Sequence, residues 1–133
     1  MSVTRVKPEG LYPAHGFAHG TIATGSRIIS IGGQIASDLD GVVRAVGDYR
    51  TQGEVALRNV GAVLEAAGAT PADLASLTVF IVDLNSDRQD EVFAGYGTAA
   101  SELGIRSTAF TVIGVSALAH EGALVEITGT AVL

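Results

Sequence analysis

Glu126 is the residue whose surroundings in the sequence most suggest chemistry. It is the single charged residue in the apolar and hydroxyl-bearing run from Leu124 to Leu133. A carboxylate in such a run must be solvated, hydrogen-bonded or partly neutralised, because a bare charge in a core is costly. A carboxylate held in a cavity can act as a general base, a general acid or a hydrogen-bond acceptor. The alternative, favoured by the local pattern alone, is that Glu126 lies on the wet face of an edge strand.

Other reactive side chains are few. The chain has no cysteine, which excludes disulfides, thiolate nucleophiles and cysteine-ligated zinc. His15 and His19 are four residues apart, but Gly16 and Gly20 interrupt any helix that would place both on one face. We therefore predict no metal site, and no disulfide supports the fold.

The length and composition predict one domain, residues 1–133, that buries part of its surface against other subunits. Of its residues 47% are hydrophobic and only 17% are charged, which is more apolar sequence than a small monomer usually exposes. No apolar run is long enough to span a bilayer, and the first residues lack the apolar core of a signal peptide. We expect a cytoplasmic protein with no membrane partner.

The charge balance disfavours nucleic acid as a partner. The formal net charge is −6, with 14 acidic and 8 basic residues. Lys7 is the single lysine, and the arginines are scattered singly along the sequence. A phosphate-backbone footprint needs clustered basic side chains, so the sequence predicts no nucleic-acid binding.

The order of predicted elements indicates an α+β fold. After a short N-terminal strand, residues 21–34 are predicted to form a hairpin that turns at Gly25 and Ser26. The Gly32–Gly33 pair at the end of this hairpin allows a bulge. The apolar stripes of two later segments predict two helices. The predicted ranges are 49–67 for the first helix, 70–73 for a helical turn, 77–84 for a strand, 88–103 for the second helix, and 107–118 and 124–131 for two strands.

These elements predict one mixed sheet with two helices on one face. Helical crossovers between strands require some parallel pairing, whereas hairpins supply antiparallel pairs. The strand over 107–118 carries no charge and is expected to be covered on both faces. No helix remains for the second face of the sheet, so we expect it to pack against copies of the chain.

Several motifs, in their order and spacing, resemble the RidA family, also called YjgF-like or reactive intermediate deaminase proteins. They are Gly16–His19, Ile31–Ala36, Gln52 ahead of 59–68, Asp73, 77–84, Tyr96, 113–118 and 125–127. The resemblance implies a chorismate-mutase-like α+β fold with a six-stranded mixed sheet. It also implies a homotrimer that has a central β-barrel and ligand clefts at the subunit interfaces.

The resemblance implies an activity as well. Well-known members hydrolyse reactive enamines and imines to ammonia and a 2-keto acid, with no cofactor or metal. An arginine holds the substrate carboxylate, a glutamate on the last strand handles water, and a glycine and a tyrosine complete the cleft. In this chain Gly33, next to Gly32, matches the glycine, and Glu126 matches the glutamate.

Three other positions depart from the family pattern. The arginine is replaced by Phe110, the tyrosine by Phe17, and a position often held by cysteine by Val112. Arg106, four residues before Phe110, is a candidate to reach back to the cleft, although a solvated loop arginine is the commoner case. His19 is a weaker candidate. The predicted site is therefore catalytic Glu126 with ligand-binding Phe17, Gly32, Gly33, Phe110, Thr111, Val112 and Arg106.

The departure makes the usual 2-imino-acid deaminase activity doubtful, because phenylalanine offers no fork to a carboxylate. The first hypothesis is an enzyme for an enamine, imine or related small carbonyl compound, with Glu126 handling the proton or water. The second is a non-catalytic binding or regulatory trimer, and in a third reading Phe17 and Phe110 simply fill the cleft. Chorismate-mutase chemistry is disfavoured because its dianionic substrate needs several convergent arginines and the strands that form the cleft carry none. Endoribonuclease activity is disfavoured by the acidic net charge and the few lysines and arginines.

Overall fold

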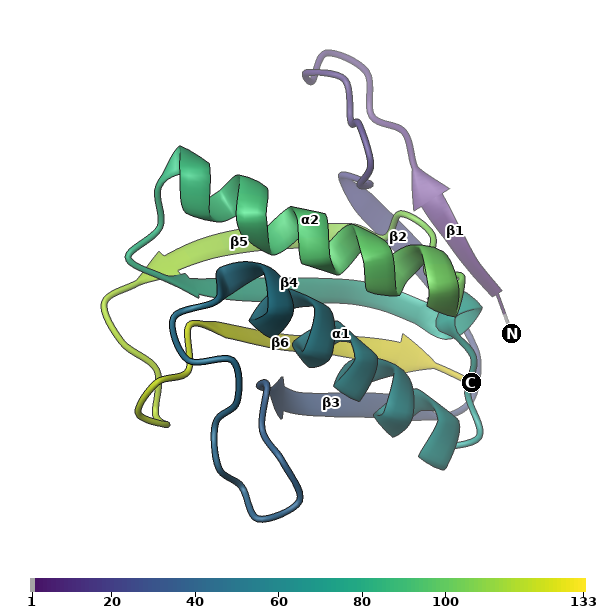
Figure 1. Ribbon diagram of the computed structural model, residues 1–133. Helices are drawn as coiled ribbons and strands as arrows, with labels where there is room; N and C mark the ends of the chain where they lie inside the picture. Colours follow the sequence, from purple (N-terminus) through teal and green to yellow (C-terminus); the bar gives the residue numbers. More distant parts are fainter. Residues whose placement is uncertain (1) are drawn as a thin grey trace.

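The computed structural model describes residues 2–133, which form six strands, two long helices and one short 3-10 helix (Figure 1). The order of elements confirms the predicted α+β class. The bounds are β1 Ser2–Val6, β2 Gly20–Thr24, β3 Ile28–Gln34, α1 Tyr49–Ala66, η1 Pro71–Asp73, β4 Leu74–Val82, α2 Ser86–Leu103, β5 Ala109–Val115 and β6 Val125–Val132.

The strands form a four-stranded sheet in the order β3-β6-β4-β5 and a two-stranded sheet of β1 and β2. β4 and β5 are parallel, while β6 is antiparallel to both of its neighbours, β3 and β4. A single bridge between Ala18 and Ala109 joins the two sets of strands. In Figure 1, α1 and α2 lie side by side over one face of the four-stranded sheet, as predicted.

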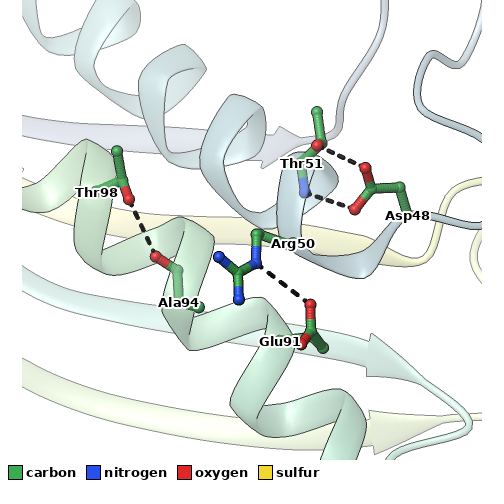
Figure 2. Close-up of polar contacts among 6 residues, drawn as sticks. All are labelled: Asp48, Arg50, Thr51, Glu91, Ala94 and Thr98. Carbon is green, nitrogen blue, oxygen red and sulfur yellow. Dashed lines mark hydrogen bonds and ion pairs between the residues drawn. The ribbon is translucent and has the colours of Figure 1, made fainter.

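The helix ends follow from their caps. Asp48 begins α1 because its carboxylate accepts hydrogen bonds from the backbone N–H and the hydroxyl of Thr51, at 3.0 and 2.7 Å (Figure 2). Gly68 follows the end of α1 with a φ of 76°, a left-handed conformation in which glycine is favoured. Asn85 caps α2, and Gly104 ends it with a φ of 74°. The predicted ends of both helices are correct to within two residues.

The two helices approach each other at glycines. A methyl group on Gly95 of α2 would lie 1.9 Å from the carbonyl oxygen of Arg50, and one on Gly53 of α1 would lie 2.7 Å from that of Val92. Figure 2 shows the same crossing, where Arg50 Nε lies 3.3 Å from Glu91 Oε2. Both partners of this ion pair are exposed, so it contributes little to stability compared with the close backbone contact.

The predicted hairpin over residues 21–34 is wrong. β2 pairs with β1, and β3 pairs with β6. The segment between β2 and β3 is held by the C-terminal strand instead, because the backbone N–H groups of Ser26 and Arg27 both donate to the carbonyl of Leu133, at 2.7 and 2.8 Å. Long-range pairing therefore overrides the local turn signal, and the chain passes from one sheet to the other at Gly25 and Ser26.

The two faces of the four-stranded sheet differ. Toward the helices point Val79 and Ile81 of β4 and Val125 and Ile127 of β6, all of them completely buried. The residues between them point the other way, because side chains alternate along a strand. On that open face, Ile113 of β5 is 39% exposed and its neighbour Thr111 is exposed. The expectation that residues 107–118 are covered on both faces is therefore wrong for the single subunit.

Candidate functional site

Phe110 and Val112 lie on the helix-covered side of β5. Phe110 is paired with Leu77 and Val112 with Val79, both buried against the helices, so their side chains share that face. The ring of Phe110 contacts two rings of α2, Phe93 and Tyr96, with centroid separations of 5.6 Å each. These separations are typical of favourable aromatic pairs, so α2 fixes the position of Phe110.

A cavity of about 550 Å³ opens beside this cluster, between α2, β5 and the loop before β2. We call it the aromatic cavity, and its walls are Tyr12, His15, Gly16, Phe17, Gln89, Phe93, Tyr96, Phe110 and Val112. No lysine, arginine or carboxylate is among these residues. The volume falls within the range of small-molecule sites, so Phe17 and Phe110 line this space and do not fill it.

The loop side of the aromatic cavity is held by its own ring contacts. His19 lies edge-on to Tyr12 and to Phe17, with centroid separations of 4.9 and 5.4 Å. The His19 Nε2 atom is 2.8 Å from the carbonyl oxygen of Tyr12. The three rings therefore pack against one another. His19 contacts residues of this loop and helps to position Phe17.

Tyr96, one of the walls of the aromatic cavity, has a phenol that stays neutral. Burial raises the pKa of its phenol to about 12, because the ionised form would lose hydration. At neutral pH the hydroxyl is therefore a hydrogen-bond donor and acceptor without charge. A ligand that presents a flat apolar surface and one neutral polar group matches these walls better than an anion does.

Glu126 lies on the open face of the sheet, between the buried Val125 and Ile127. Its direct partner across the strands is Phe80. A methyl group on Gly33 would lie 2.1 Å from Glu126 Oε1, so the carboxylate covers the backbone at that glycine. The register between β3 and β6 shifts between Ile31 and Gln34, which confirms the predicted bulge at Gly32 and Gly33.

Gln52 of α1 positions the start of the strand that carries Glu126. Its side chain is completely buried, and its carbonyl accepts a hydrogen bond from the Leu124 N–H at 2.8 Å. Its amide nitrogen donates to the carbonyls of Gly122 and Ala45, at 3.0 and 3.2 Å. One buried side chain thus ties the helix to the two loops beside β6, which fixes where β6 begins.

The predicted site residues fall into three places within one subunit. Phe17, Phe110 and Val112 meet at the aromatic cavity. Glu126, Gly32 and Gly33 lie on β6 and the edge strand β3, and Thr111 points to the open face from the opposite edge strand. Arg106 lines neither place but a separate cavity of about 470 Å³ with Arg5, Lys7 and Ser107, which we call the cationic cavity. The subunit alone does not bring Glu126 to the aromatic walls.

The predicted site lacked six walls of the aromatic cavity: Tyr12, His15, Gly16, Gln89, Phe93 and Tyr96. Gln89, Phe93 and Tyr96 follow one another at spacings of four and three, which places them on one face of α2. Because Phe110 was already a candidate, this spacing could have indicated that the same face of α2 lines the site. Tyr12 and His15 belong to an irregular loop, and nothing in their spacing indicated the cavity.

The described part of the chain offers neither a metal cluster nor a membrane-spanning helix. Among residues 2–133, no cluster of three or more histidine, aspartate or glutamate side chains is placed to hold a metal ion. In the same residues, neither helix is long and apolar enough to span a bilayer.

Comparison with known proteins gives consistent matches. The family model described as endoribonuclease L-PSP matches residues 8–133. YyfB from Yersinia pestis, a protein of the conserved Rid family, is 32% identical, with complete coverage of both chains and a TM-score of 0.87. E. coli TdcF, solved with bound serine, is 26% identical over 98% of each chain, with a TM-score of 0.71. A RutC family protein of Pyrococcus abyssi is 35% identical over 69 residues, 51% of this chain and 54%, or about half, of that relative.

Proposed function

The chain belongs to the endoribonuclease L-PSP family, which includes the Rid proteins, and from this premise we propose that it is a homotrimer with small-molecule clefts at its subunit interfaces. The predicted Rid/YjgF membership is thereby confirmed. The proposed ligand is an enamine, an imine or a related small carbonyl compound that carries no carboxylate. A cytoplasmic location is part of the same proposal.

The observation that carries the proposal is the separation of the two halves of the predicted site. Glu126 and Gly33 lie next to the β3 edge of the four-stranded sheet, whereas Phe110 and Val112 lie on β5 at the other edge. Beyond the single bridge at Ala109, β5 has no further strand partner among the described residues on its outer side. In the proposed ring of subunits the β5 edge of one copy lies beside the β3 edge of the next, so that both halves border the same interface.

The ligand class follows from the walls. The family position for the carboxylate-binding arginine is Phe110, and the aromatic cavity has no basic side chain other than His15. TdcF has been solved with bound serine, which supports small-molecule binding in this family. In this chain a carboxylate would lack its charge-assisted partner, at a cost of roughly 2–5 kcal/mol of binding. A planar neutral molecule keeps the favourable ring contacts and a hydrogen bond to Tyr96.

In the proposed reaction, water adds to the carbon of a C=N bond while the Glu126 carboxylate accepts the water proton. The carboxylic acid then returns that proton to the nitrogen. Glu126 then accepts the hydroxyl proton of the carbinolamine and passes it to the nitrogen, and the C–N bond breaks to give the carbonyl compound and ammonia. One water is consumed for each ammonia released, and no electrons are exchanged.

The test measures ammonia release from two substrates, 2-aminoacrylate and a neutral aryl imine. We expect the wild type to prefer the neutral imine and Glu126→Gln to reduce its turnover about 100-fold or more, as for loss of a general base. Glu65→Gln is the matched control, since Glu65 is an exposed carboxylate on α1. Phe110→Arg should raise turnover of 2-aminoacrylate at least about tenfold, because it restores the carboxylate fork. Unchanged turnover in a trimeric Glu126→Gln protein contradicts the catalytic role.

A non-catalytic binding trimer is the second candidate. It is favoured by the position of Glu126 on the sheet face opposite Phe110 in the same subunit. In that case a neutral aromatic ligand raises the melting temperature of the wild type and is recovered unchanged. Phe110→Ala should then remove the thermal shift, while Glu126→Gln leaves it in place.

A further inference from the structure

The cationic cavity concentrates positive charge in an acidic protein. Arg5, Lys7 and Arg106 line this space of about 470 Å³, so three of the 8 basic residues of the chain face one cavity. Thr4, Ser107 and Thr108 lie in the same wall, and no lining residue is acidic. The convergence arises from the fold, because β1 lies beside the loop that enters β5: Arg5 Nε donates to the Ser107 carbonyl at 3.1 Å.

The three cations have no carboxylate partner, a condition that they share with Arg27 and Arg88 among the described residues. The other three arginines are paired: Arg44 with Asp38, Arg50 with Glu91 at 3.3 Å, and Arg58 with Glu54 and Glu102 at 3.2 and 2.7 Å. Within residues 2–133, no carboxylate lies at ion-pair distance from Arg5, Lys7 or Arg106. Asp73, next to the lining residues Pro71 and Ala72, is engaged by the Thr70 N–H at 2.8 Å. The positive charge is therefore available to a ligand.

We propose that the cationic cavity binds the phosphate group of a small phosphomonoester. Two guanidinium groups and an ammonium group match a phosphate dianion better than a single carboxylate, because guanidinium forks bind phosphate oxygens in pairs. The hydroxyls of the wall add hydrogen-bond donors. The cationic cavity shares no lining residue with the aromatic cavity and does not include Glu126, so phosphate binding there does not rest on the proposed deaminase chemistry.

A neighbouring cavity indicates where the organic part of the ester would lie. A third cavity, of about 390 Å³, shares Arg5, Lys7 and Ser107 with the cationic cavity and continues to Tyr12 and Phe17. Its walls along the loop are mostly apolar and include Pro8, Leu11 and Pro13. The cationic cavity alone exceeds the size of one phosphate group and lies within the range of metabolite sites. A phosphomonoester with an apolar body fits this arrangement.

The test titrates the full-length protein with phenyl phosphate and with phenol, and follows the amide resonances of Ser107 and Thr108. Phenyl phosphate should saturate and shift these amides, and phenol should not. Arg106→Gln and Arg5→Gln should each weaken binding about tenfold or more, because each removes a charge-assisted contact. Arg27→Gln, which removes an exposed arginine outside the three cavities, should change affinity less than about twofold.

Three results overturn the proposal. One is non-saturable binding. Another is an equal loss in Arg27→Gln and Arg106→Gln, which indicates general charge attraction. The third is that single-stranded RNA binds through Arg5 and Arg106 whereas phenyl phosphate does not bind. Phosphate binding that persists in Glu126→Gln separates this site from the proposed catalytic one.

Discussion

The two faces of the four-stranded sheet differ in how far a single subunit buries them. The covered face is completed within one subunit, where Val79 and Ile127 meet the helices with no exposed surface. The open face carries rows of residues such as Glu126–Phe80–Ile113 across three strands, in which Glu126 and Phe80 are half-buried and Ile113 is exposed. The covered face is buried within one chain, whereas the open face would be buried only in the proposed trimer.

The comparison also separates two kinds of constraint. On the covered side the helices approach so closely at Gly53 and Gly95 that even a methyl group has no room. On the open side Thr111 and Ile113 tolerate larger side chains sterically. Substitutions on the covered side should therefore act on folding, and substitutions on the open side on assembly.

The largest effect is expected at the helix crossing. Gly95→Ala places a methyl group 1.9 Å from the Arg50 carbonyl, so the helices must separate, and we expect a loss of roughly 3 kcal/mol in the free energy of unfolding. Urea denaturation followed by circular dichroism measures it. Gly97→Ala is the matched control on the same helix: its methyl group meets no atom within 4 Å, and it should gain about 0.5–1 kcal/mol. Equal effects at both positions would mean that the crossing is not tight.

An intermediate effect is expected at the rim of the covered face, where Tyr96 meets the aromatic cavity. Burial raises the pKa of Tyr96 from its ordinary value of 10.0 to about 12. Between these pH values the unfolded chain releases the phenolic proton and the folded chain keeps it, so stability falls as pH rises. We expect a slope of up to roughly 1.4 kcal/mol per pH unit from this residue.

Urea denaturation between pH 9 and pH 12 measures that slope. Tyr96→Phe should remove this contribution, whereas Tyr12→Phe should retain it, since Tyr12 is 69% exposed. A slope that is unchanged in Tyr96→Phe would assign the pH dependence to other groups.

The smallest effect on folding is expected on the open face. Ile113→Arg should change the unfolding free energy of the subunit by about 0.5 kcal/mol or less, because the side chain is already 39% exposed. The same change should dissociate the proposed trimer, since it places a charge in the buried interface. Sedimentation velocity distinguishes trimer from monomer. Leu39→Arg, at a fully exposed loop position, should leave the assembly intact, and a trimeric Ile113→Arg protein would place the interface elsewhere.

Local signals predicted much of the fold. The apolar stripes placed both helices, and the features that end them in the structure, the Asn85 cap and the left-handed glycines 68 and 104, are short-range effects as well. The partners of β2 and β3 were not predictable from Gly25 and Ser26, since the hydrogen bonds to Leu133 that decide them span more than a hundred residues. Sheet order depends on such distant contacts, which no local window contains.

Local patterns in the sequence predicted part of the candidate site as well. Strand alternation alone indicates that Phe110 and Val112 share a face and that Thr111 does not. It does not reveal that Glu126 occupies the other face of the subunit, because that depends on which side of β6 the helices cover. The family resemblance supplied the residues, and the structure supplied their separation. The role of each of these residues stays a prediction.

The place of β6 in the sheet has a consequence for how the protein is made. β6 is the last strand of the chain, yet it lies between β3 and β4, and neither of those strands pairs with the other. While the ribosome is still translating residues 125–132, the nascent sheet lacks its middle. Both helices can form early, but β3 stays without a hydrogen-bonding partner until β6 has been made. The native sheet is therefore expected to close only after residues 125–132 have been translated, and until then the edge of β3 is exposed to wrong pairing.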